Sequence, residues 1–583
     1  MQFGAGYNQT GTTVTTTIAK NNHTAGTSTN LGTSVTTNTL DGAAVNFQPV
    51  DISTAGAVIS YNGASCFVRY SDATQETIPG ATSITSLNHA TRNKHNADGS
   101  VTPMECPQIV GWNSTGCALF QKNPDTNAYE SPLLSQLVAP NSGWTVNYVM
   151  AINDSGCIVG GANYSGSNTN IVTGQHGCLL IPVQVTSVSF DGTKYWQLES
   201  DDATTQYSAP QWTDTNGNYN ASDPGEHNYA VAYTRNTKPK IGATFKIPGA
   251  SNWTNLKFKA TGPDGISIPA TAGTVGGDGV TVTLAVTEST TALPNTVKFY
   301  NWADSISFTL NWSMSVDGGS TWTSIFTTKH TVYVTLDDPS PNTDGQHFEE
   351  TLFYLGCKDA NGVSSQTDLI NDVWTDFQSR AMHRVSNLSS AMTYYANSAN
   401  PYSTHNGVDS LMAFGDGRCG SYQQLMMQIL YDQGLPESTV KPKVVTPNTD
   451  YISQALTAYQ AQYGVDPTTI YDQRNVRNIF FVKNWTLSTS TPFSPVDLPD
   501  IPAQGNSNPI AVFGDHALVE INGQIYDPSY GDGPYSSVID WQDASIDGFG
   551  VQFIDPTGLA ANFVLYVGKL ETHATQNVNY NDQ

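Results

Sequence analysis

Charged residues are scarce in this chain. Asp, Glu, Lys and Arg make up 13% of its 583 residues, and 24 Lys and Arg stand against 49 Asp and Glu, for a formal net charge of −25. Nucleic-acid binding depends on Lys and Arg that displace the counterions of the phosphate backbone. The composition therefore argues against a nucleic-acid partner and against an anionic membrane surface. It fits a soluble protein that negative charge keeps dispersed.

The sequence also lacks a long apolar run, since a membrane helix needs about 20 consecutive apolar residues. The segment Met1–Gly4 leads into Thr-rich sequence without the basic and apolar parts of a secretory leader. We expect no membrane span and no signal peptide in this chain. Either a leader has already been removed, or export uses another signal.

Helix-favouring residues are scarce before about residue 360, whereas Gly and Pro number 50 and 30. Such a composition is typical of a loop-rich β protein. The length corresponds to roughly two to four domains of ~150 residues each. We predict an all-β repeat region over residues 1–184, an Ig-like β-sandwich over 185–337 and an α+β domain over 338–583.

Three cysteines mark a weak internal repeat in the first region. Cys66, Cys117 and Cys178 each lie in the second of two strand-like segments and recur roughly every 50 to 60 positions. This pattern predicts a propeller blade or a stacked β repeat. Residues 151–160, with His176 to Cys178, resemble the bacterial extracellular HAF-type repeats. Ordinary strand–turn–strand similarity is the alternative explanation.

Alternating strand-like runs and turn residues predict the sandwich. The run 307–312 is separated by a hairpin signal, Asp317-Gly318-Gly319, from the run 330–336. Inside this region, oxygen-bearing side chains alternate at Asp214, Asn216 and Asn218, with Glu226 following.

Ca²⁺ prefers such hard oxygen ligands. These four residues are therefore a candidate calcium loop, although its register differs from that of an EF-hand. An ordinary polar Asn/Gly turn is the alternative. His330, His383 and His405 have no ligand spacing around them, so we assign no zinc site.

Cys419 follows a glycine-rich turn that begins at Gly415. The seven cysteines are an odd number, so at least one thiol is unpaired. From Ser421 to Asp432 the apolar residues recur at helical spacing, and Gly434 follows the expected helix end. Cys419 is therefore expected at a helix N-terminus, where the helix dipole favours a thiolate. A small buried residue in a glycine turn is the alternative.

His516 opens a predicted hairpin. Residues 517–521 and 524–526 are strand-like, and Asn522-Gly523 between them is a two-residue turn signal. His516 and Asp527 then lie on adjacent strands at the open end, where opposed residues are ~4.5–5.5 Å apart. An acid there can orient the imidazole. We predict a Cys–His–Asp set for thiol acyl transfer, made of Cys419, His516 and Asp527.

The order of these residues resembles the bacterial transglutaminase-like family. That family has Gly-x-Cys at a helix start, then His with Val-Glu on a strand, then Asp-Pro-Ser one hairpin later. The matching residues here are Gly417, Cys419, His516, Val519, Glu520, Asp527, Pro528 and Ser529. The resemblance covers about 240 residues and implies a papain-like fold. Leu518 departs from the Trp that many members carry.

The resemblance implies an enzyme that acts on protein or peptide amides. Water as acceptor would make it a peptidase or amidase, and an amine would make it a cross-linking transamidase. The chemistry requires no cofactor, and Ca²⁺ at the candidate loop is the only one suggested. We expect a bacterial extracellular or cell-surface location. The alternative is a non-enzymatic adhesin or structural protein with an idle thiol domain. Substrate, oligomeric state and disulfide pairing stay open.

Overall fold

A computed structural model describes most of the chain. The residues outside the description are 1, 11–12, 23–26, 31–38, 41–42, 45–47, 54–56, 62–64, 73, 96–100, 124–125, 137, 139–142, 155, 167–171, 181, 216–218, 220–224, 248–249, 321, 342, 344, 396–406, 451–452, 455–456, 458–459, 462–463, 465–474, 483–501, 508, 510–511, 555–562 and 570–575. For strands within residues 2–49 and 563–569 only the backbone is described.

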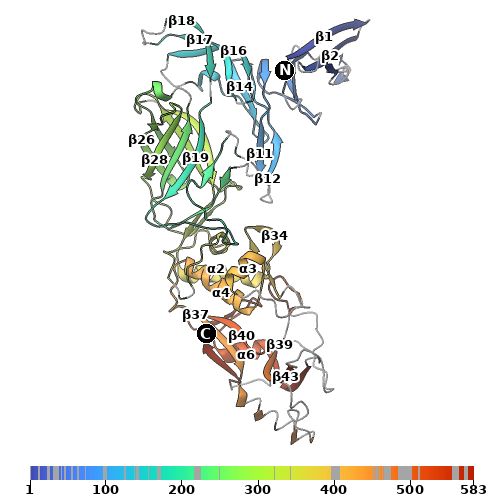
Figure 1. Cartoon of the computed structure of the whole chain (residues 1–583), viewed down its shortest axis with the longest axis vertical. Coiled ribbons are helices and arrows are strands. Elements are labelled where there is room, and N and C mark those ends of the chain that lie inside the picture. The colour runs from blue at the N-terminus through green and yellow to red at the C-terminus, as the bar shows by residue number, and fades with distance from the viewer. Residues whose placement is uncertain are drawn as a thin grey trace.

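The chain is rich in β-structure and is built from several sheets, which confirms that part of the prediction. Figure 1 shows the N-terminal sheets at one end, a sandwich-like body next to them, then a layer of helices, and the last sheets at the far end. No helix in the described part of the chain has the length and apolar character needed to cross a bilayer.

The first region consists of small antiparallel sheets. The first two are β1-β2-β3 (Gln2–Thr10, Thr13–Asn22, Thr27–Asn30) and β4-β5 (Thr39–Leu40, Ala43–Ala44). The next is β6-β7-β8-β9 (Gln48–Ile52, Val58–Tyr61, Cys66–Arg69, Gln75–Thr77). Then come β10-β13-β14-β15 (Ala81–Leu87, Ile109–Asn113, Cys117–Lys122, Tyr129–Glu130), with the inserted hairpin β11-β12 (Thr91–His95, Val101–Glu105), and β16-β17-β18 (Trp144–Ile152, Ile158–Tyr164, Gly174–Leu180).

The three cysteines of the repeat occupy related places in three of these sheets. Cys66 pairs with Tyr61 and Cys117 with Trp112, each directly after the hairpin turn, whereas Cys178 pairs with Gly160 further along its strand. One apolar core lies between the first two of these sheets, and a second core joins the second sheet to the third. Neighbouring sheets along this region therefore share apolar cores.

The central region contains three sheets. Their orders are β22-β21-β19-β24-β28-β27, β26-β25-β30-β31 and β20-β23-β32-β29. The strands are β19 Gln184–Asp191, β20 Tyr195–Trp196, β21 Trp212–Thr213, β22 His227–Asn228, β23 Val231–Thr234, β24 Lys240–Lys246, β25 Lys257–Thr261, β26 Ser267–Ala272, β27 Thr274–Val275, β28 Thr281–Glu288, β29 Lys298–Tyr300, β30 Phe308–Ser315, β31 Thr323–His330 and β32 Val332–Thr335.

Aromatic side chains join the first two of these sheets. Phe245 on β24 stacks on Phe258 on β25 with ring centroids 4.2 Å apart, and Trp312 on β30 meets Phe245 edge-on at 5.6 Å. Along β30 the side chains of Phe308, Leu310 and Trp312 are buried because alternate residues point to one face. Each buried aromatic contributes about 1.5–3 kcal/mol to this core.

Strand β32 joins the central region to the C-terminal one. Val332 and Val334 pack into the core of the central region, whereas Tyr333 between them packs into the C-terminal core. The segment that follows is held by the end of a helix. Leu336 N–H donates to Gln433 Oε1 at 2.9 Å, and Ser340 N–H donates to the Tyr431 carbonyl at 2.8 Å. The two regions therefore share a continuous interior at this strand.

The C-terminal region has helices between its sheets. The described helices are α1 Glu350–Cys357, α2 Gln366–Ser379, α3 Val408–Phe414, α4 Cys419–Asp432 and α6 Val538–Ser545. The sheets are β42-β41-β40-β37-β45, β39-β38-β43-β44, β33-β34 and β35-β36. Their strands are β33 His383–Arg384, β34 Asn387–Ala391, β35 Thr393–Tyr394, β36 Asp416–Gly417, β37 Val440–Pro447, β38 Asn475–Val482, β39 Val512–Phe513, β40 His516–Ile521, β41 Gln524–Asp527, β42 Asp532–Tyr535, β43 Ile546–Ile554, β44 Phe563–Lys569 and β45 Val578–Asp582.

Candidate active site

Helix α4 begins at Cys419, as the apolar spacing predicts. The side chains of Tyr422, Leu425 and Ile429 are buried, and the helix contacts β40 and β37. Gly417 is needed just before the helix, because a Cβ there would lie 2.7 Å from Ser421 Cβ. The backbone N–H of Arg418 donates to Ser421 Oγ at 3.3 Å and so ties the turn to the first helical turn.

Cys419 therefore occupies the first position of a helix, and its side chain is half-buried. A Cβ added at the next residue, Gly420, would meet no atom within 4 Å. There is thus space next to Gly420, one residue after the thiol. Backbone N–H groups at a helix start carry partial positive charge, which favours a thiolate or a developing oxyanion.

The predicted hairpin is formed by β40 and β41. Asn522 and Gly523 both have positive φ, 53° and 80°, as a two-residue turn of this kind requires. Strand pairing joins Val519 to Tyr526 and Ile521 to Gln524.

If the same pairing continues by one residue, Asp527 lies opposite Leu518. His516 and Asp527 are then diagonal neighbours on the two strands and not a directly opposed pair. The expectation of directly opposed residues is wrong in this detail. Diagonal neighbours are still within reach of long side chains.

His516 and Asp527 form a buried ion pair. His516 Nε2 lies 2.9 Å from Asp527 Oδ2, and both residues are 2% exposed. Two further groups donate to the same carboxylate: Trp541 Nε1 to Oδ2 and the Tyr530 backbone N–H to Oδ1, each at 3.4 Å. The carboxylate is held from three directions, so it can fix the orientation of the imidazole.

The electrostatics favour a charged imidazole. Burial lowers the pKa of His516, but the Asp527 carboxylate and then the Cys419 side chain outweigh burial and raise the pKa to about 10. The second ring nitrogen, Nδ1, is buried and makes no hydrogen bond of ordinary geometry within the described residues, although the Cys419 side chain is close enough to act on the ring. Since Nε2 is occupied by Asp527, Nδ1 is the nitrogen left to exchange a proton with the thiol.

Aromatic rings enclose the imidazole. Trp541 on α6 stacks on His516 with centroids 6.2 Å apart, and Phe513 and Tyr530 approach it at 5.2 and 5.8 Å. Tyr394 meets Tyr530 edge-on at 5.5 Å. Burial raises the pKa of both tyrosines, and Cys419 is among the groups close enough to add to the shift. The rings exclude water, which strengthens the charge interactions inside.

The sequence did not single out Trp541, Tyr394 or Phe513 for this site. Trp541 lies on α6 and Tyr394 on β35, far along the chain from both Cys419 and His516. No spacing rule connects such distant positions. An isolated Trp in a helical segment was the only available signal for Trp541.

Two polar residues next to the site residues in sequence are Gln423 and Asp515. Gln423 Nε2 donates to the Lys443 and Leu518 carbonyls, at 2.9 and 2.6 Å, so this amide links α4 to the sheet. Asp515 is exposed, and the acid that contacts His516 is Asp527.

The candidate calcium loop is described only in part. Asn216 and Asn218 lie outside the described residues. Asp214 and Glu226 are both buried, and Glu226 Oε1 accepts hydrogen bonds from the backbone N–H and the hydroxyl of Thr215, at 2.9 and 2.8 Å. One carboxylate oxygen of the proposed ligand set therefore serves the loop itself.

Comparison with known proteins yields little for this chain. No protein-family model and no curated protein matches it. One solved structure, the extracellular domain of a putative hybrid two-component system from B. thetaiotaomicron, is similar at 9% identity and a TM-score of 0.13, over 55% of this chain and 35% of that one. Another, TcdA4 of Morganella morganii, is similar at 7% identity and a TM-score of 0.11, over 91% and 22%. The chain thus spans about a third of the first structure and about a fifth of the second. Similarities this weak carry no argument about fold or function.

Proposed function

We propose that the C-terminal region is a thiol acyl-transfer enzyme that acts on protein or peptide amides, with Cys419 as nucleophile. The observation that carries the proposal is the buried pair of His516 and Asp527, together with a half-buried cysteine at the start of α4 that is close enough to raise the pKa of the histidine. A nucleophile, a proton carrier and an orienting acid are the set that this chemistry needs. The packing of α4 against β40 and β37 supports the finer inference of a papain-like, transglutaminase-like domain.

The first step is attack by the Cys419 sulfur, with His516 as its proton partner. Because the pKa of His516 is about 10, the imidazole carries a proton at neutral pH, and the cation stabilises a neighbouring thiolate. Cys419 attacks the carboxamide or peptide carbonyl carbon. The oxygen becomes negatively charged next to the first N–H groups of α4.

The second step releases the amine. His516 gives its Nδ1 proton to the leaving nitrogen, and a thioester to Cys419 remains. The neutral imidazole then takes a proton from the acceptor, which is water or a second amine, and the acceptor oxygen or nitrogen displaces the thiolate. Asp527 holds the ring through Nε2 in both directions of transfer.

The proposal places the protein outside the cell or on its surface, with a protein or peptide substrate. The β regions that precede the enzyme would serve as a binding or spacer arm.

Alkylation by iodoacetamide, followed by peptide mapping, tests the proposal. Cys419 should react fastest of the seven cysteines at a pH of about 6, where an ordinary thiol is mostly protonated. Two cysteines serve as internal controls: burial raises the pKa of half-buried Cys178, and it raises that of Cys357, which is fully buried, to about 12. Cys419 reacting no faster than Cys178 would contradict the enzyme assignment.

The acceptor is identified by a second experiment. The chain is incubated with a glutamine-bearing protein and a fluorescent primary amine, alongside the Cys419→Ala variant. Label joined to the protein indicates transamidation, whereas ammonia or new peptide ends without label indicate hydrolysis. Neither product, in the presence of rapid Cys419 alkylation, would show that the protein substrate is of another class.

A further inference from the structure

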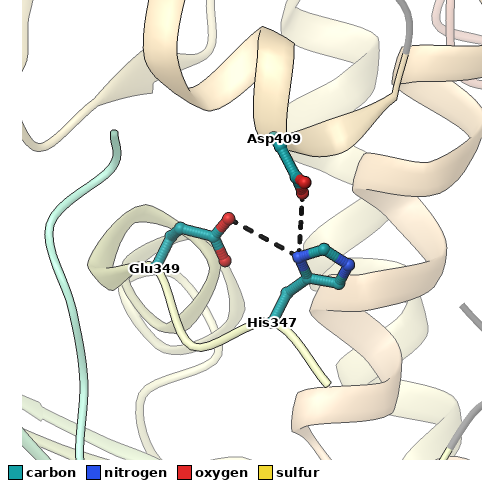
Figure 2. Close-up of side chains that lie close together, drawn as sticks. All are labelled: His347, Glu349 and Asp409. Atoms are coloured by element: carbon teal, nitrogen blue, oxygen red, sulfur yellow. Dashed lines mark ion pairs between the residues drawn. The ribbon is translucent and has the colours of Figure 1, made fainter. Parts of the chain in front are cut away.

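A second histidine lies among carboxylates outside the candidate active site. His347 and Glu349 are in the segment just before α1, and Asp409 is in the first turn of α3 (Figure 2). The two parts of the chain are separated by α2 and the β33-β34 hairpin in sequence, so only the tertiary structure brings them together.

The spacing of the three ligand atoms suits a metal ion. His347 Nδ1 lies 2.9 Å from Asp409 Oδ1 and 3.5 Å from Glu349 Oε1, and the three atoms are within 4.8 Å of one another. Two ligands bound ~2.1 Å from a tetrahedral ion are about 3.4 Å apart. The observed separations lie around that value, so an ion could enter with small side-chain movements.

An independent observation comes from the second carboxylate oxygen of Glu349, Oε2, which lies on the side of the carboxylate that faces the imidazole, as Oε1 does (Figure 2). This residue is 1% exposed, yet among the described residues its Oε2 atom is buried without a hydrogen-bond partner. Leaving a buried carboxylate oxygen unsatisfied costs free energy. An ion pair with His347 through Oε1 leaves Oε2 without a partner. A cation bound between Glu349 and His347 could contact both oxygens and so remove that cost.

The surroundings add negative charge and an entry path. The backbone of Glu199 pairs with that of Glu349 as an isolated bridge, which sets a further acidic residue beside the cluster. Two carboxylates, those of Glu349 and Asp409, lie against one imidazole. The Asp409 side chain is 71% exposed, so the cluster is open to solvent on that side.

We propose that His347, Glu349 and Asp409 bind a divalent transition-metal ion of the Zn²⁺ class. One imidazole nitrogen with carboxylate oxygens suits such an ion better than Ca²⁺, which takes oxygen ligands alone. A water molecule would complete the tetrahedron on the exposed side. The ion would tie the start of α1 to α3, the helix that leads through β36 into the Cys419 turn.

The test uses the full chain with Cys419→Ala as background, because a thiol beside an imidazole also binds zinc. The protein is dialysed against a chelator, then titrated with Zn²⁺ in a calorimeter, and metal content is measured after gel filtration. Co²⁺ serves as a spectroscopic probe, since tetrahedral coordination gives intense visible absorption. We expect one Zn²⁺ per chain, a raised Tm that the chelator reverses, and no comparable rise with Ca²⁺.

Two variants locate the site. Asp409→Asn keeps the shape of an exposed side chain and should weaken zinc binding by at least about tenfold, because a carboxylate ligand is lost. His347→Gln should abolish the Co²⁺ absorption bands. The matched control is His383→Gln, a half-buried histidine on β33, which should bind zinc as the background protein does.

Three results would overturn the proposal. One is the absence of zinc from the background protein after titration. Another is zinc binding that His347→Gln and Asp409→Asn leave unchanged. The third is a stability loss in Asp409→Asn that has the same size with metal and with chelator. An ion pair of His347 with the two carboxylates, without a metal ion, predicts that result. None of these results depends on whether Cys419 is catalytic.

Discussion

The two histidine–carboxylate groups of the C-terminal region are built from the same residue types but differ in exposure. At the candidate active site His516 and its acid are both 2% exposed and are enclosed by aromatic rings. At the His347 cluster the imidazole is partly exposed, and the side chain of Asp409 is 71% exposed. A closed pair amplifies charge interactions and suits proton transfer, whereas an open cluster admits an ion and its water.

The partners of the carboxylates differ in the same way. Asp527 accepts three hydrogen bonds from protein groups, so it has a fixed orientation. In the open cluster the second oxygen of Glu349 has no protein partner among the described residues. Protein groups therefore supply the hydrogen-bond partners of Asp527, whereas the proposed cation would supply the missing partner of Glu349.

The largest expected effect is on the rate of Cys419 alkylation, which should depend on His516 and not on His347. At a pH of about 6 the His516→Ala variant should lose Cys419 alkylation by about 10²-fold, because an ordinary thiol is only ~0.3% thiolate there. His347→Ala should lose zinc binding and keep rapid alkylation. The second-order rate constant with iodoacetamide and the zinc stoichiometry are measured for both variants. An equal loss of Cys419 alkylation in His516→Ala and His347→Ala would contradict the assignment of different functions to the two histidines.

Stability should also distinguish the two groups. Asp527→Ala leaves a buried imidazole without its acid and should lower the free energy of unfolding by about 3–5 kcal/mol. Asp409→Ala removes an exposed partner and should cost within about 1 kcal/mol when a chelator is present. Urea unfolding followed by circular dichroism gives both values. A loss at Asp409 as large as that at Asp527 would show that the open cluster is a structural ion pair.

The closed pair should also make stability depend on pH. The pKa of His516 is about 10 in the folded chain and near 6.5 when unperturbed. Between these values the folded protein holds a proton that the unfolded chain has released, so the free energy of unfolding falls as pH rises through this window. The excess stability of the wild type over His516→Gln should shrink from a pH of about 6.5 to about 10. Parallel stability curves for the two proteins would contradict the raised pKa.

The smallest effect concerns the ring above His516. Trp541→Phe keeps an aromatic ring but removes the N–H that donates to Asp527 at 3.4 Å. Losing this hydrogen bond should cost about 1 kcal/mol in the free energy of unfolding, with the rate of Cys419 alkylation reduced by less than about tenfold. Trp541→Ala is the comparison, because it also opens the site to water. If Phe and Ala have the same effect on alkylation, the N–H rather than the ring is responsible.

Local sequence patterns predict the elements that depend on contacts between near neighbours in the chain. The apolar spacing from Tyr422 onward predicts α4, and the Asn522-Gly523 pair predicts the hairpin that carries His516 and Asp527. The β-rich, multi-sheet character follows from composition and turn residues. The propeller, Ig-like and papain-like assignments within it are finer than the described sheets decide, and they stay predictions.

The connection that follows residue 337 shows what local sequence patterns do not decide. The Pro-rich segment from 339 indicates a linker, but Ser340 is bound to the end of α4 and Tyr333 packs into the C-terminal core. A linker and a packed connection have similar sequences, because proline and serine suit both. Whether the segment is packed depends on partners almost 100 residues away.

By itself, the sequence determined which residue carries the thiol, where its helix begins and which hairpin brings an acid toward His516, because these depend on contacts between near neighbours. Only the tertiary structure decided that Trp541 and Phe513 enclose the imidazole and that the pair is buried. It alone brought Asp409 to His347 and Glu349. The physical reason is that burial, and with it the strength of every charge interaction, comes from residues that are distant in the chain.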